Sequence, residues 1–246
     1  MAARLSVNVN KVATLRNSRG GAVPSVIGAV ETCVAAGAPG ITVHPRADER
    51  HIRRADVIEI SAWLRAHAPG IEFNIEGDPR PDLIELVHAV RPDQCTLVPV
   101  TPGEITSHAG WSPDLSPEVL RPVVQRMRDA GIRVSVFVDP EEAAVRWAAA
   151  TGANRVELYT EPYARAFARG AAEGHASYAT YRRVAETAHA LGLGVNAGHD
   201  LDLDNLTLFH ALPHLDEVSI GHALIARALW VGLEQTVVDY LRALQL

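Results

Sequence analysis

Short runs rich in β-branched residues alternate with longer stretches of helical spacing along the whole chain. The short runs predict eight strands, at 6–10, 40–44, 72–76, 94–100, 133–139, 155–160, 194–199 and 217–222. The longer stretches repeat Ala, Leu and Val every three or four residues, at 26–36, 55–66, 82–90, 117–130, 141–150, 178–191, 203–211 and 223–244. The last of them is interrupted near Gly232, and glycine follows several others, where helices commonly end.

Eight strands alternating with eight helical segments in 246 residues predict a (β/α)8 barrel, a TIM barrel of the α/β class. The pattern holds from 1 to 246, so we expect a single domain with extra loop or helix insertions. The alternative is an open, doubly wound sheet, which usually carries a GxGxxG turn after its first strand; this chain has none. The long connections 101–116 and 161–177 are predicted to be loops, either lids and interfaces or plain surface excursions.

The composition favours a folded protein and narrows the range of its partners. Hydrophobic residues make up 48% and charged residues 21% of the chain, which argues against disorder. The net charge of −6 argues against a general binder of nucleic acids or acidic membranes. No run of roughly 18 apolar residues occurs, so no membrane span is expected. The widely spaced Cys33 and Cys95 indicate reduced core thiols in a cytoplasmic protein.

Polar side chains stand at or near the ends of most predicted strands. They are Asn8, Asn10, Lys11, His44, Arg46, His51, Glu76, Asp139, Glu157, His199 and His222. Active sites of α/β barrels lie at the C-terminal ends of the strands, where the loops from all strands meet. A purely structural barrel does not need a polar group at so many of these positions, so the clustering predicts an enzyme.

Several of these residues also have a structural interpretation. His44 could be a core histidine, and Glu76 could be a surface residue that begins a loop. Glu157, between Val156 and Leu158, is expected inside the barrel, where its partner could be purely structural. The functional alternative is that a half-buried carboxyl group has a raised pKa, which suits a general base.

Glycine and arginine near the strand ends indicate phosphate binding. Gly198 and Gly221 directly precede His199 and His222, and backbone N–H groups beside such glycines can approach an anion closely. A tight turn without a ligand would have the same sequence. The segment 16–21, Arg-Asn-Ser-Arg-Gly-Gly, also suits phosphate binding, because guanidinium groups bind phosphate through two hydrogen bonds.

The sequence does not support a metal site. The segment 200–204 has aspartate at every second residue, like a calcium loop, but Asn205 and Ala211 replace the glycine and glutamate that such loops require. The histidines also show no HExxH or similar spacing. The residues alone therefore predict a barrel enzyme that acts on a small phosphorylated substrate by acid–base chemistry.

Segments along nearly the whole chain match one known family, in family order. They are 7–20 (VNVNKVATLRNSRG), 40–46 (GITVHPR), 48–52 (DERHI), 73–77 (FNIEG), 97–99 (LVP), 156–160 (VELYT), 195–199 (VNAGH) and 219–223 (SIGHA). In these segments the chain resembles the pyridoxine 5′-phosphate synthase family. The resemblance implies condensation of 1-deoxy-D-xylulose 5-phosphate with 3-amino-2-oxopropyl phosphate to pyridoxine 5′-phosphate, phosphate and water. It implies no metal and no organic cofactor.

The resemblance also implies a role for each matching residue. His44 and Glu76 match the general bases, His199 the proton donor, and Glu157 a residue that stabilises the transition state. The positions for the aminoketone phosphate are Asn8, Arg19, Gly221 and His222. The positions for deoxyxylulose phosphate are Lys11, Arg46, His51 and Thr106, and further substrate-binding positions are Asn10 and Asp200. The family forms octamers built from dimers, so we expect a homo-octamer.

The chain departs from the family pattern at a few positions. Many members have Asp-His in place of Asn10-Lys11 and glycine in place of Asp200, and the segment 106–111 with His108 is less acidic than expected. A lysine can bind an anion but lacks the acid–base range of imidazole. We expect Asp200 to point away from a bound phosphate, because like charges repel. Two other functions remain open: a Schiff-base aldolase with Lys11 as nucleophile, and a barrel that only binds a phosphorylated metabolite.

Overall fold

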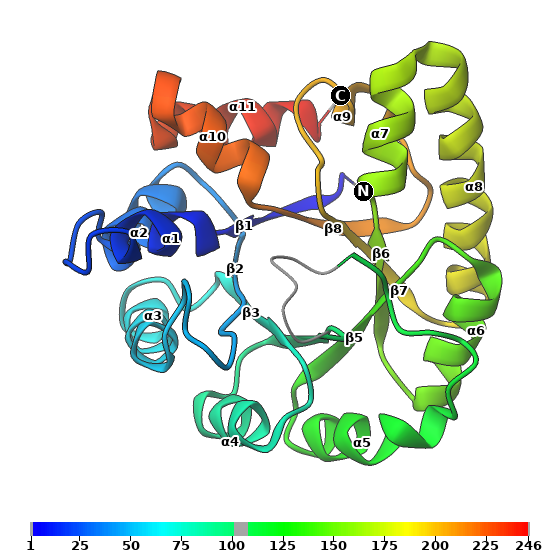
Figure 1. The fold of residues 1–246 in the computed structure, drawn as a ribbon, viewed down its shortest axis with the longest axis horizontal. Helices are drawn as coiled ribbons and strands as arrows, with labels where there is room; N and C mark the ends of the chain where they lie inside the picture. Colours follow the sequence, from blue (N-terminus) through cyan, green and yellow to red (C-terminus); the bar gives the residue numbers. More distant parts are fainter. Residues whose placement is uncertain (1, 101–107, 246) are drawn as a thin grey trace.

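Eight parallel strands close into a barrel in the computed structural model, which describes residues 2–100 and 108–245 (Figure 1). The strands are β1 (Arg4–Asn8), β2 (Gly40–Val43), β3 (Glu72–Gly77), β4 (Gln94–Leu97), β5 (Arg133–Val138), β6 (Arg155–Tyr159), β7 (Gly194–Gly198) and β8 (Leu215–Ile220). Each strand pairs with its neighbours in the sequence, and β8 pairs with β1, which places Ser6 beside Ser219. The predicted (β/α)8 barrel is confirmed.

Helices surround the barrel and cover the outer face of its sheet (Figure 1). They are α1 (Asn10–Asn17), α2 (Val26–Ala35), α3 (Arg54–His67), α4 (Pro81–Val90), the short 3-10 helix η1 (Pro117–Val119), α5 (Arg121–Asp129), α6 (Glu142–Thr151), α7 (Glu161–Arg169), α8 (Ala171–Ala190), α9 (Leu206–Phe209), α10 (His222–Val231) and α11 (Leu233–Ala243). Outward-facing strand residues such as Val7, Ile41 and Ile75 are buried in the core, and such β-branched side chains favour strands. None of the helices in the described part of the chain is long and apolar enough to cross a membrane.

Polar side chains occupy the inside of the barrel. The Ser6 and Thr42 hydroxyl groups lie 2.6 Å apart, Asn74 donates a hydrogen bond to Thr42, and Thr96 donates one to Asn74. A second polar layer lies nearer the N-terminal ends of the strands and contains Glu72, Gln94, Arg133, Asn196 and Glu217. Hydrogen bonds within the two layers compensate for the loss of water around these groups.

Two helices of the structure were not predicted from the sequence. Residues 10–17 form α1 immediately after β1, and the connection 161–177, predicted to be a loop, forms α7 and the start of α8. The first turn of α7 contains Pro162, a position that favours helix starts, and Gly170 at φ 138° separates the two helices. The predicted interruption near Gly232 is confirmed, because this residue separates α10 from α11.

The two cysteines are free thiols in the core. Cys33 lies in α2 and Cys95 in β4, and both side chains are completely buried. Burial raises the pKa of each thiol to about 12. Neither thiol is therefore a nucleophile at neutral pH, and the chemistry of the protein lies elsewhere.

Candidate active site

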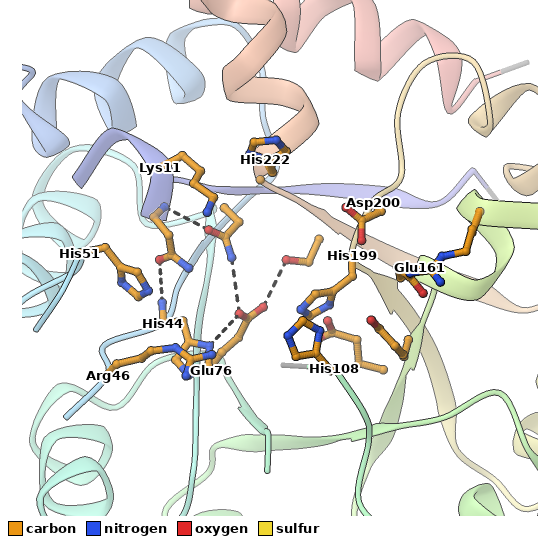
Figure 2. Close-up of a pocket in the computed structure, with 17 residues that line it drawn as sticks. Lys11, His44, Arg46, His51, Glu76, His108, Glu161, His199, Asp200 and His222 are labelled. Atoms are coloured by element: carbon orange, nitrogen blue, oxygen red, sulfur yellow. Dashed lines mark hydrogen bonds and ion pairs between the residues drawn. The ribbon is translucent and has the colours of Figure 1, made fainter. Parts of the chain in front are cut away.

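A cavity of about 430 Å³ opens at the C-terminal ends of the strands (Figure 2). Twelve of the predicted site residues line it: Asn8, Asn10, Lys11, His44, Arg46, His51, Glu76, Glu157, His199, Asp200, Gly221 and His222. Parallel strands deliver their last residues to the same end of a barrel, so side chains far apart in the sequence meet there. The sequence therefore located the cavity and most of its polar wall.

Three residues with a predicted role in phosphate or substrate binding are not among these wall residues. Arg19 is exposed after α1 and is not part of the cavity wall, and Thr106 lies outside the described residues. The predicted role of Arg16 in phosphate binding is wrong, because its buried guanidinium forms an ion pair with Asp56 at 2.5 and 2.8 Å. Arg16 also donates to the carbonyl oxygen of His51, so it holds the loop after β2 instead of a ligand.

Glu76, near the end of β3, is the centre of the hydrogen-bond network in the cavity (Figure 2). Its carboxylate accepts hydrogen bonds from Asn8 Nδ2 at 3.4 Å and Ser219 Oγ at 3.3 Å, and lies 3.6 Å from His44 Nδ1. Burial raises the pKa of Glu76 to about 7, against smaller lowering effects of the Ser219 hydrogen bond and the Arg46 charge. A carboxyl group with this pKa both releases and takes up protons near neutral pH.

His44 directly follows β2, and the residues after β1 hold its backbone. The His44 N–H donates to Asn10 Oδ1 at 2.9 Å, and the Asn10 N–H donates to Asn8 Oδ1 at 3.0 Å. Burial, followed by the charge of Arg46, lowers the pKa of His44 to about 3, so its imidazole is neutral near pH 7. Its Nε2 atom is buried and has no hydrogen-bond partner among the described residues. This nitrogen is available to a bound molecule.

Glu157, in β6, is a second buried carboxyl group of the cavity. Only 2% of the residue is exposed. Burial, followed by the negative charge of Glu76, raises the pKa of Glu157 well above its usual range. Gly198 leaves room for this carboxyl group, since a Cβ atom there would lie 2.4 Å from Glu157 Oε1. Burial of Glu157 therefore favours its protonated form, which can donate a hydrogen bond.

His199 follows β7 with its backbone in the left-handed region, at φ 81°. Residues other than glycine rarely adopt this conformation, and it is often found at functional sites. The imidazole packs against Phe137 and Tyr159, with ring centroids 4.9 and 5.4 Å away. Burial lowers the pKa of His199 to about 4, and its Nδ1 atom is buried without a hydrogen-bond partner among the described residues. The cavity thus contains a second neutral imidazole with a free nitrogen.

Groups that can bind anions flank the acid–base cluster in two regions. Lys11 at the start of α1, with Arg46 and His51 from the loop after β2, lines one part of the wall (Figure 2). Gly221 and His222 line another part, at the N-terminus of α10, where the first N–H groups of a helix lack partners within the helix. Both regions therefore offer groups of the kind that bind phosphate.

Asp200 lines the cavity wall, and its orientation away from a bound phosphate stays a prediction. Its backbone is also left-handed, at φ 59°. Burial raises the pKa of Asp200, and the negative charge of Glu161 adds to this effect, while the charge of His222 opposes it.

Five further residues of the wall were not predicted to be site residues: His108, Tyr159, Glu161, Arg165 and Ser219. Tyr159 and Ser219 each lie two residues from an inward-facing position, Glu157 and Gly221, so the alternation along strands could have indicated them. Glu161 and Arg165 form an ion pair one turn apart on α7, the helix that the sequence analysis missed. His108 lies in the long connection after β4.

This arrangement suits proton transfer to and from a small phosphorylated molecule. Neutral imidazoles and carboxyl groups with raised pKa values surround one cavity, and each can take part in general acid–base catalysis. The residues described contain no group of three or more His, Cys, Asp or Glu side chains placed to hold a metal ion.

Comparison with known proteins gives the relatives of this chain. The family model of the pyridoxal phosphate biosynthesis protein PdxJ matches residues 5–246. The pyridoxine 5′-phosphate synthase of Bacteroides thetaiotaomicron is 53% identical over 243 residues, which are 98% of this chain and 99% of that protein. The pyridoxine 5′-phosphate synthase of Leptospira biflexa is 49% identical over 253 residues, covering 99% and 97% of the two chains.

Solved structures with a similar fold are distant in sequence. The KGPDC structure from Streptococcus mutans has a TM-score of 0.65 at 11% identity and covers 100% of this chain and 98% of its own. The 3-keto-L-gulonate-6-phosphate decarboxylase of Vibrio cholerae has a TM-score of 0.63 at 10% identity, with the same coverage of 100% and 98%. At this identity they show the barrel fold alone. By its sequence, then, this chain belongs to the PdxJ family, whose members compared above are pyridoxine 5′-phosphate synthases.

Proposed function

We propose that the protein is a pyridoxine 5′-phosphate synthase of vitamin B6 biosynthesis, which joins 1-deoxy-D-xylulose 5-phosphate to 3-amino-2-oxopropyl phosphate. The amino group of one substrate condenses with the carbonyl group of the other, phosphate and water leave, and the pyridine ring closes. The observation that carries this proposal is the grouping of His44, Glu76 and His199 around one cavity with two anion-binding regions. Ring closure with repeated proton transfers needs several acid–base groups, and two phosphorylated substrates need two anion sites.

His44 and Glu76 are the general bases of this proposal. Neutral His44 takes a proton from the substrate at its free Nε2 atom. Glu76 Oε2, which lies 3.6 Å from His44 Nδ1, then balances the charge that the imidazole gains. Glu76 exchanges protons itself, because its pKa is about 7. Asn10 supports this step by holding the backbone of His44, since its side-chain Oδ1 atom accepts the His44 N–H.

His199 is the proton donor, and Glu157 stabilises the transition state. In the cavity without substrate His199 is neutral, because burial lowers its pKa to about 4. A phosphate dianion bound nearby raises this pKa, so the substrate itself charges the donor. In its protonated form, which burial favours, Glu157 donates a hydrogen bond to a substrate oxygen that becomes negative in the transition state.

The two phosphate groups occupy the two anion-binding regions. Lys11, Arg46 and His51 bind deoxyxylulose phosphate, because a lysine, an arginine and an imidazole converge there. The helix N-terminus at Gly221 and His222 binds the aminoketone phosphate. Other proposed contacts are Asn8 and Arg19 for the aminoketone, Thr106 for deoxyxylulose phosphate, and Asp200 for a substrate hydroxyl or amino group.

The function is tested by mixing the purified protein with both substrates. We expect pyridoxine 5′-phosphate, identified by absorbance and mass, and phosphate release in equal amounts. His44→Asn and Glu76→Gln should each slow turnover by roughly 100-fold or more, whereas the exposed control Glu234→Gln should not. A folded wild type that forms no product would overturn the proposal, and borohydride trapping of a substrate on Lys11 would favour an aldolase.

We further propose that copies of this chain assemble into an octamer. The end of α10 exposes an apolar patch, with Leu229 68%, Trp230 87% and Val231 43% exposed. Exposed clusters of large apolar side chains commonly mark protein interfaces. Light scattering after size-exclusion chromatography should give the octamer for the wild type and a smaller species for Trp230→Glu. A monomeric wild type at micromolar concentration contradicts this proposal.

A further inference from the structure

Residues 108–111, here called the strap, are bound across the ends of β4 and β5. The Gly110 N–H donates to Asp139 Oδ1 at 3.1 Å, and the Trp111 N–H donates to a carbonyl oxygen of β5 at 3.0 Å. On the other side of the strap, the side chain of Trp111 donates from Nε1 to the carbonyl oxygen of the last residue of β4 at 3.0 Å. The strap is therefore tied to both strands at the mouth of the barrel.

Close packing restricts the strap further. A Cβ atom on Gly110 would lie 2.4 Å from backbone atoms of β5 and the residue after it, so only glycine allows the two segments to meet this closely. The Trp111 ring stacks on Trp147 of α6, with centroids 6.1 Å apart and an interplanar angle of 22°. Trp147 in turn donates from Nε1 to the Leu115 carbonyl oxygen at 2.6 Å. The strap and the residues after it are thus fixed to the outside of the barrel as well.

Asp139 is the strand-end residue to which the proposed mechanism gives no role. It directly follows β5, but it is not part of the cavity wall. It does not cap the next helix either, since α6 begins after Glu141 without a side-chain cap. Its carboxylate instead accepts the hydrogen bond of Gly110, which is 29 residues away. This contact indicates that Asp139 acts by holding the strap in place.

The first residue of the strap, His108, lines the cavity. In Figure 2 its side chain lies at the same cavity as that of His199. A positive charge on His108 lowers the pKa of His199, after the larger effects of burial and of His44. The His108 side chain is exposed, so a molecule that enters the cavity meets it directly.

We propose that His108 is a further substrate-binding residue, and that Asp139 is the positioning residue that holds it at the wall of the cavity. This inference rests on the proposed function, because its ligand is an oxygen atom of the phosphorylated substrates. An imidazole donates a hydrogen bond to such an oxygen, and a protonated imidazole binds a phosphate dianion more strongly.

Hydrogen exchange in the full-length protein tests the anchor and needs no turnover. Asp139→Ala removes the acceptor, so we expect the Gly110 and Trp111 amides to exchange about ten-fold faster or more. Asp139→Asn keeps an acceptor oxygen and should restore most of the protection. The matched control Asp114→Ala, an exposed aspartate in the same connection, should change nothing. Unchanged exchange in Asp139→Ala overturns the positioning role.

Steady-state kinetics and separate titrations with each substrate test the binding role. His108→Ala should raise the KM of one substrate about ten-fold, the loss of one charge-assisted hydrogen bond, while kcat changes about two-fold at most. Asp139→Ala should raise the KM of the same substrate, and Asp139→Asn should recover it. Because both residues act through one contact, the double variant should be no worse than the worse single variant. Losses that multiply, or an unchanged KM in His108→Ala, overturn the proposal.

The experiments distinguish a failure of the proposed function from a failure of this inference. A wild type that makes no pyridoxine 5′-phosphate refutes the function, and the titrations and the exchange rates then still decide the roles of His108 and Asp139. A wild type that turns over normally, together with His108→Ala of wild-type KM and affinity, refutes this inference and leaves the function intact.

Discussion

Ionisation of the buried Glu76 carboxyl group lowers the free energy of unfolding of the native protein as the pH rises. Replacing Glu76 by glutamine should remove this pH-dependent loss of stability. The pKa of Glu76 rises from 4.5 to about 7, because folding removes its carboxyl group from water. The folded protein therefore binds this proton more tightly than the unfolded chain does. As the pH rises from 4.5 to 7, the unfolded chain ionises first and the free energy of unfolding falls. Above that window both states are ionised and the full cost remains.

The difference between a pKa of 4.5 and one of about 7 corresponds to about 3 kcal/mol, most of which develops between pH 5 and pH 8. Glutamine has nearly the same shape, and it retains an oxygen that can accept from Asn8 or Ser219. The variant also removes the charge that raises the pKa of Glu157, so the second carboxyl group ionises more easily. Both effects stabilise the variant at high pH.

Urea unfolding at pH 5 and at pH 8, at one protein concentration, measures this difference. We expect the advantage of Glu76→Gln over the wild type to grow by roughly 2–3 kcal/mol between the two pH values. The matched control Glu234→Gln, exposed on α11, should follow the wild type at both. An advantage that is the same at both pH values would show that Glu76 ionises equally in the folded and unfolded protein. Burial would then not raise the pKa of this carboxyl group.

Three further predictions concern other buried groups. Asp56→Ala leaves the Arg16 guanidinium buried without its ion-pair partner. The free energy of unfolding, measured in urea, should therefore fall by about 3–5 kcal/mol. A loss below about 1 kcal/mol would contradict this. Gly198→Ala places a methyl group 2.4 Å from the Glu157 carboxyl group. Turnover should therefore fall about ten-fold or more, while the circular dichroism spectrum stays unchanged. Wild-type turnover would show that the carboxyl group has room to move. In NMR titrations His199 should show a pKa of about 4, and one near its ordinary value of 6.5 would refute the effect of burial.

The barrel and the centre of its site could be predicted because their signals are local in the sequence. Periodicity locates strands, and the residue that ends a parallel strand must lie at the mouth of the barrel. His44, Glu76 and His199 each follow or end such a strand, so their positions in the sequence already placed them around one cavity.

The remaining errors come from contacts that no local pattern contains. Arg16 lies among residues typical of phosphate loops, but its partner Asp56 is 40 residues away, and only the fold brings the two together. Glu161 and Arg165 were missed with their helix, because the whole connection 161–177 was predicted to be a loop. The role of Asp139 depends on the backbone of Gly110, and a backbone N–H has no signature in a sequence.

The hydrogen bonds inside the barrel also bear on whether the chain could be cut into two fragments that fold separately. Gln94 of β4 donates to Glu217 of β8, and Asn196 of β7 donates to both of them. A fragment that ended after β4 would leave Gln94 without these partners, and the complementary fragment would lack Gln94. Each half would then carry unsatisfied polar groups on the surface it must bury. The hydrogen-bond partners in this layer of the interior therefore come from both halves of the barrel.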